Sequence, residues 1–140
     1  MTERSKTDKI IVHGSYSRKE HDLTVSDLYQ WHVVEKEWPT IGYHIMINQQ
    51  GMIFILNPLQ EYCYHTIGEN HRSIGICIAG GWAEGNEWVD NYSIRQKHNL
   101  KAVCGLLRDI YPEAEVMGHR DAQADRECPG FDVKAWYSLD

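Results

Sequence analysis

Two histidines and one cysteine in this sequence have the types and neighbours of metal ligands. His13 ends the β-rich run KIIVH and His119 follows the run AEVMG, so each lies at the end of an expected strand and beside a glycine. Cys128 stands in front of a proline, at the far end of the polar loop that His119 begins. Two imidazoles and one thiolate leave a fourth tetrahedral position open, the arrangement of catalytic rather than structural zinc. These ligand types suit zinc better than magnesium or calcium.

Spacing alone leaves two interpretations open, a metal site and an ordinary polar loop. The sequence has no compact CxxC or HExxH signature, which would make a metal site specific. Other histidines and cysteines have ordinary explanations. Polar neighbours predict surface positions for three histidines, and apolar neighbours predict burial for two cysteines: His21, His71, His98, Cys77 and Cys104.

The candidate ligands need a sheet edge to bring them together, and the hydrophobic pattern predicts one. Four segments have the composition of strands or of a hairpin: residues 9–13, 43–56, 73–80 and 114–119. Helices are expected after Thr24 or Ser26 up to Pro39, from the capping box of Ser93 and Gln96 to Pro112, and over residues 131–139. This irregular alternation predicts an α/β fold in a single domain, with a mixed central β-sheet flanked by helices. One buried stripe is expected on the middle helix: Leu100, Val103, Cys104, Leu107 and Ile110.

Length and charge limit the classes of function. The 140 residues suffice for one domain, residues 1–140, of which residues 1–8 are expected to be a flexible N-terminal segment. The formal net charge of −6 disfavours binding to nucleic acid or to an anionic membrane. The first residues lack the apolar run of a signal peptide, and no stretch approaches a membrane span. We therefore expect synthesis to end in the cytoplasm, and a monomer is the simplest expectation.

The five tryptophans receive structural interpretations. Trp31, Trp38 and Trp136 are expected in the core or in other structural roles. Trp82 and Trp88 flank AEGNE, an expected exposed loop, and could border a groove or have no specific role. The second interpretation is preferred.

Four longer motifs occur in a fixed order: IIVHGS, WHVVEKEWPTIGYHIMINQQGMI, HTIGENHRSIGICIAGG and GHRDAQADRECPGFD. Together they resemble the zinc-dependent N-acetylmuramoyl-L-alanine amidases, whose fold is shared with peptidoglycan recognition proteins. The short, single-domain lysozymes of T-odd phages belong to the same group. The resemblance extends from about residue 9 to residue 137. It implies that His13, His119 and Cys128 bind Zn²⁺, and that Tyr43 faces the scissile carbonyl.

The resemblance also assigns residues around the metal. His65 matches a histidine that lines the substrate groove, and Asn70 falls near it. Arg126 occupies the place where the phage enzymes usually carry a catalytic lysine. Because arginine keeps its proton, we assign Arg126 electrostatic stabilisation and exclude it as a general acid. Two plainer interpretations stay open: Arg126 as a surface arginine, and Tyr43 as an aromatic residue that only packs on the sheet.

The resemblance implies hydrolysis of the amide between N-acetylmuramic acid and L-alanine in peptidoglycan. The setting would be a phage or prophage endolysin that reaches the wall after release, although action on cytoplasmic muropeptides also fits. Some proteins of this fold bind muropeptides without cutting them and typically lack the zinc cysteine, so Cys128 favours the enzyme. T-odd phage lysozymes also bind RNA polymerase, and the sequence neither supports nor opposes such a partner. A purely structural zinc site is the remaining alternative.

Overall fold

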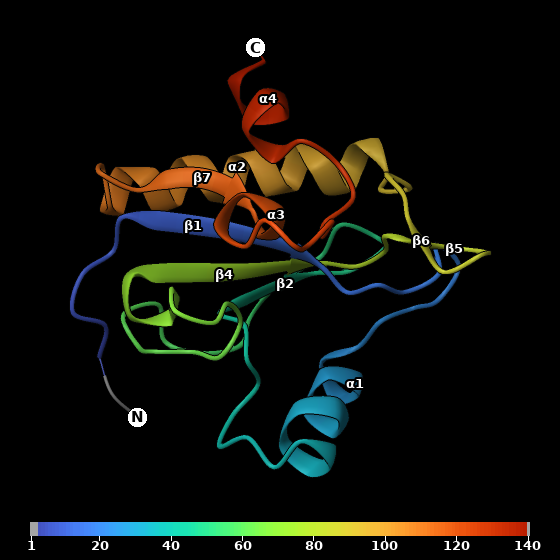
Figure 1. The fold of residues 1–140 in the computed structure, drawn as a ribbon, viewed down its shortest axis with the longest axis horizontal. Coiled ribbons are helices and arrows are strands. Elements are labelled where there is room, and N and C mark those ends of the chain that lie inside the picture. The colour runs from blue at the N-terminus through green and yellow to red at the C-terminus, as the bar shows by residue number, and fades with distance from the viewer. Residues whose placement is uncertain (1–2, 140) are drawn as a thin grey trace.

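The predicted mixed sheet lies at the centre of the molecule (Figure 1). The computed structural model describes residues 3–139. Its main sheet has five strands in the order β3-β2-β4-β1-β7. β1 pairs in parallel with β4 and β7, β2 pairs in parallel with β4, and β3 runs antiparallel to β2. The strand bounds are β1 Lys9–Gly14, β2 Ile45–Ile47, β3 Ile53–Ile55, β4 Ser73–Ile78 and β7 Glu115–Gly118.

One face of this sheet is covered by the long helix α2, Ile94–Ile110 (Figure 1). Ser93 Oγ accepts the N–H of Gln96 at 3.1 Å, and Gln96 Oε1 accepts the N–H of Ser93 at 2.8 Å, so the predicted capping box is present. Ile110 is 59% exposed, and its expected place in the buried stripe is wrong. The next residue, Tyr111, packs against that core instead. The buried partners of the sheet on α2 are Leu100, Val103, Cys104 and Leu107.

A second, smaller core lies around α1, Val25–Tyr29, which begins at the N-cap Thr24. The helix continues as a π-helix over Gln30–Glu35, in which the N–H of Lys36 donates to the carbonyl of Trp31 at 3.2 Å. Because a π-helical turn holds more residues than an α-helical one, later side chains leave the expected 3.6-residue register. Trp31, the second residue of this π-helix, is 37% exposed, so it does not lie in the core, the first of its two expected roles.

Alternation along β1 decides which face carries the candidate ligand. Ile10 and Val12 belong to the core under α2. Since successive strand residues point to opposite faces, His13 lies on the other face. The register pairs His13 with Cys77 of β4, so this thiol sits beside it in the sheet.

Shorter elements complete the chain: a 3-10 helix Asn70–Arg72, β5 Trp82–Ala83, β6 Glu87–Trp88, α3 His119–Ala122 and α4 Val133–Ser138. The N-terminal segment lies against the loop that precedes His65. There the Arg4 guanidinium donates to the carbonyl oxygens of Leu59 and Glu61, while the predicted flexibility of residues 1–8 stays a prediction. Among residues 3–139, no helix is both long and apolar enough to cross a membrane.

Candidate metal centre and active site

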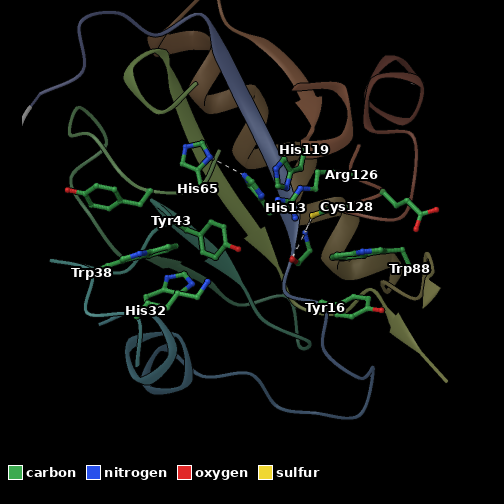
Figure 2. Close-up of a pocket in the computed structure, with 14 residues that line it drawn as sticks. His13, Tyr16, His32, Trp38, Tyr43, His65, Trp88, His119, Arg126 and Cys128 are labelled. Atoms are coloured by element: carbon green, nitrogen blue, oxygen red, sulfur yellow. Dashed lines mark hydrogen bonds between the residues drawn. The ribbon is translucent and has the colours of Figure 1, made fainter. Parts of the chain in front are cut away.

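His13, His119 and Cys128 meet at one edge of the sheet (Figure 2). Their possible ligand atoms all lie within 4.8 Å of one another. β1 and β7 are adjacent parallel strands, so the residues at their carboxyl ends reach the same edge. His13 is the next-to-last residue of β1, and His119 follows β7 directly. Cys128 lies in the loop between α3 and α4, and its thiol is close to the imidazoles of His13 and His119.

Each candidate ligand is held by a further contact. Nε2 of His13 lies 3.0 Å from Nδ1 of His65 and 3.1 Å from Oγ1 of Thr66. Nε2 of His119 lies 2.5 Å from Oε1 of Gln123. The backbone N–H of Gly14 donates to Sγ of Cys128 at 3.2 Å. With Nε2 of both rings engaged, Nδ1 is the nitrogen that each histidine can offer to a metal.

Burial sets the protonation of the cluster. It lowers the pKa of His13 well below its ordinary value, helped by the neighbouring His65 and His119. It also lowers the pKa of His119, against the hydrogen bond to Gln123. Burial raises the pKa of the Cys128 thiol to about 12, against the Gly14 N–H and the charge of Arg126. Neutral imidazoles are the ligand form, and a buried thiolate needs a cation beside it, so this donor set fits zinc.

A cavity of about 400 Å³ opens over the cluster. Aromatic rings stand on two sides of it (Figure 2). Tyr16 and Trp88 form one pair, with ring centroids 4.5 Å apart. Trp38 and Tyr64 form the other, with centroids 6.0 Å apart. The cluster thus lies at the bottom of an aromatic-sided groove, where a bulky substrate can be held next to the ligand atoms.

Tyr43 lies where the resemblance places it, in the cavity and turned toward the cluster (Figure 2). Its ring centroid is 5.3 Å from that of His13. Burial raises the pKa of Tyr43 well above its ordinary value, so its hydroxyl keeps the proton. The residue therefore presents a hydrogen-bond donor beside the candidate ligands.

Arg126 also lines the cavity, on the loop that ends at Cys128. Its side chain is exposed, and its charge lowers the pKa values of both His119 and Cys128. It places positive charge at the rim of the site, and its predicted electrostatic role stays a prediction.

The two residues predicted to contact substrate have other contacts. His65 lines the cavity, but its Nδ1 is turned toward His13 and lies 2.9 Å from Oγ1 of Thr66. Asn70 Oδ1 accepts the backbone N–H groups of His65 at 2.9 Å and Thr66 at 2.8 Å. Asn70 therefore holds the loop that carries these residues. Its predicted substrate contact, like that of His65, stays a prediction.

Sequence reasoning missed much of the groove wall. Trp88 borders the cavity, so the preferred interpretation of no specific role is wrong, and Trp38 lines the cavity rather than the core. Tyr16 and Tyr64, which line the cavity, received no role. Thr66 and Gln123, which contact the candidate ligands but do not line this cavity, received none either. A weak signal existed, because several aromatic residues lie near the motifs that contain the ligands. Nothing in their spacing indicated that they face one cavity.

Comparison with known proteins identifies the family. The profile described as N-acetylmuramoyl-L-alanine amidase matches residues 3–131. The endolysin of Enterobacteria phage K11 is 35% identical over 136 residues, which cover 96% of this chain and 88% of that protein. The endolysin of Escherichia phage T7 is 31% identical over 135 residues, with 96% and 88% covered. The chain belongs to the N-acetylmuramoyl-L-alanine amidase family.

Solved structures agree on the fold. The Ph2119 endolysin of a Thermus scotoductus bacteriophage superposes with a TM-score of 0.81 at 21% identity, covering 99% of this chain and 86% of that one. Drosophila PGRP-LB superposes with a TM-score of 0.78 at 23% identity, covering 96% and 81%. The predicted family, fold class and class of enzyme, a peptidoglycan amidase, are confirmed.

Proposed function

We propose that this protein is a zinc-dependent amidase that cleaves the bond between N-acetylmuramic acid and L-alanine in peptidoglycan. The observation that carries the proposal is the cluster of His13, His119 and Cys128 at the bottom of the groove. A zinc ion held there would supply a Lewis acid for the amide carbonyl and would lower the pKa of an attacking water to about 7. A protein that only bound muropeptides would not need this set of donors.

In the hydrolysis the C–N bond breaks, and the proton that the attacking water loses is taken up by the leaving amine of L-alanine. Residues of the cavity stabilise the charge that develops on the way. As the carbonyl carbon is attacked, negative charge develops on its oxygen, and a donor placed there lowers the barrier. Tyr43 is the donor, because its hydroxyl keeps its proton and its ring lies beside that of His13. Arg126 stabilises the same charge from the rim and transfers no proton. The aromatic pairs on either side hold the rings and chain of the substrate by stacking and apolar contact.

We further propose that the protein works as a monomeric phage or prophage endolysin. Its relatives in phages K11 and T7 are endolysins, and their aligned regions span 88% of each relative. In this setting the enzyme is made in the cytoplasm and reaches the wall after release.

Mass spectrometry of purified peptidoglycan tests the reaction directly. Incubation with the enzyme is expected to release stem peptides that begin at L-alanine. A chelator should abolish the release and added zinc should restore it. Intact amide bonds across several peptidoglycan types, with folded and zinc-loaded protein, would refute the hydrolase. Release that a chelator does not affect would refute zinc dependence alone.

A further inference from the structure

A side chain outside the candidate ligand set contacts Nε2 of each candidate ligand histidine: Thr66 contacts His13, and Gln123 contacts His119. Thr66 is 2% exposed, and its Oγ1 lies between Nε2 of His13 at 3.1 Å and Nδ1 of His65 at 2.9 Å. Its backbone N–H is already bound by Asn70 Oδ1, which fixes the loop behind it. Because buried polar groups are hydrogen-bonded, the Thr66 hydroxyl is expected to accept a hydrogen bond from one ring and to donate one to the other.

One assignment of protons is consistent with the contacts on this side, with Nε2–H of His13 directed at Thr66 Oγ1 at 3.1 Å and also at Nδ1 of His65 at 3.0 Å. His13 Nε2–H donates to Thr66 Oγ1, and the Thr66 hydroxyl donates to His65 Nδ1. The opposite nitrogen of His65 then carries a proton and faces Ser73 Oγ at 3.4 Å, and that hydroxyl donates to the Glu69 carbonyl at 2.7 Å. In this arrangement Nδ1 of His13 has no proton, which is the state that a metal requires.

Gln123 makes the corresponding contact with Nε2 of the second histidine, His119, from a different part of the chain. It follows His119 by four residues, and its backbone N–H donates to the His119 carbonyl at 2.9 Å. That turn brings its side chain back to the imidazole, where Oε1 accepts from Nε2–H at 2.5 Å. Nδ1 of His119 is thereby left without a proton, like Nδ1 of His13.

We propose that Thr66 and Gln123 are positioning residues for the metal centre. Each holds Nε2 of one ligand histidine, and together they fix both rings in the tautomer that presents Nδ1 to zinc. The inference rests on the proposed zinc dependence, and it extends that proposal to two residues outside the ligand set. Loss of an outer contact of this kind typically weakens metal binding about 10- to 100-fold.

The test measures zinc affinity by competition with a chromogenic chelator, independently of hydrolysis. Thr66→Val and Gln123→Leu remove the polar group at similar size. Thr66→Ser and Gln123→Glu keep an oxygen at the same place. Gln60→Leu makes the matched change at an exposed position remote from the cluster. Thermal unfolding of the zinc-free proteins checks folding, and the visible spectrum of cobalt-loaded protein reports coordination geometry.

We expect the zinc dissociation constant to rise about 10- to 100-fold in Thr66→Val and Gln123→Leu, with an altered cobalt spectrum. Thr66→Ser should restore the wild-type value, and Gln123→Glu should bind zinc at least as tightly because a carboxylate is the stronger acceptor. Wild-type affinity and an unchanged spectrum in both Thr66→Val and Gln123→Leu would overturn the inference. If the wild type itself took up no zinc, the proposed metal centre would fail along with it. A wild type that binds zinc and cleaves peptidoglycan, beside unaffected variants, would refute the positioning role only.

Discussion

The backbone N–H of Gly14 donates a hydrogen bond to Sγ of Cys128, although the two residues are 114 positions apart in the chain. Gly14 follows the candidate ligand His13 directly, so the end of β1 carries both an imidazole of the cluster and the N–H that donates to the thiol. A donor aimed at sulfur favours the thiolate that zinc requires. The packing is close, since a Cβ on Gly14 would lie 2.2 Å from the Tyr92 hydroxyl. The strand end therefore fixes the backbone as well as the ligands.

Replacing the thiol tests the metal centre. We expect Cys128→Ser to lose bound zinc and hydrolysis together, because a serine hydroxyl does not ionise to give a ligand at neutral pH. Metal content by mass spectrometry and release of stem peptides measure the two effects. Cys104→Ala, which removes a buried thiol on α2, should retain both. Full zinc occupancy in Cys128→Ser would exclude Cys128 as a ligand.

Removal of one hydroxyl tests the oxyanion role of Tyr43. Tyr43→Phe should lower kcat by about 10²- to 10³-fold, the usual effect of losing one such donor. Zinc binding should be unchanged, since Tyr43 is not among the candidate ligands. Tyr29→Phe, at a residue 53% exposed on α1, is the matched control. An unaltered kcat in Tyr43→Phe would leave Tyr43 as a packing residue.

Two substitutions of Arg126 test whether its positive charge contributes to the reaction. Arg126→Ala should reduce kcat/KM by about 10- to 100-fold, which corresponds to one hydrogen bond to a charged group, about 1.5–3 kcal/mol. Arg126→Lys should keep most of the activity, because lysine carries the same charge. The assay is a pH profile of peptide release for all three proteins. Equal rates for wild type and Arg126→Ala would identify a plain surface arginine.

The ion pair between Asp8 and Arg72 is expected to make the free energy of unfolding depend on pH. The Arg72 guanidinium holds the pKa of Asp8 down to about 2, through two hydrogen bonds. A carboxyl whose pKa is lower in the folded than in the unfolded protein stabilises the folded state. This contribution is fully present at pH values above the pKa in the unfolded chain, about 3.9, and is lost as the pH falls through the folded-state pKa of about 2. Asp8→Asn should therefore lower the free energy of unfolding by about 1–2 kcal/mol at pH 7, allowing for partial solvent screening.

Urea unfolding at several pH values checks this, with Asp109→Asn as the control. The difference between wild type and Asp8→Asn should shrink steadily below pH 4 and be mostly lost as the pH falls through 2. A difference that stayed constant between pH 7 and pH 2 would show that the ion pair is not its source.

Local signals in the sequence were enough to place the main elements. The run KIIVH predicted β1, and the Ser93 and Gln96 box predicted the start of α2, because strand alternation and helix capping depend on neighbouring residues. The expected helix after Thr24 departs from an α-helix at Gln30–Glu35, where it widens into a π-helix. Such a change of turn depends on packing against the sheet, which a fixed period of 3.6 residues cannot express.

The family was predicted from the resemblance of four ordered motifs, and the fold class from the alternation of strand and helix patterns. The candidate metal ligands were found by their residue types and neighbours. Three features became visible only in the folded chain: Trp88 borders the groove, Asn70 binds its own loop, and Thr66 and Gln123 contact the imidazoles. The reason is physical. Side-chain direction and hydrogen-bond partners are set where strands and loops from distant parts of the chain pack together, and no local period encodes that packing.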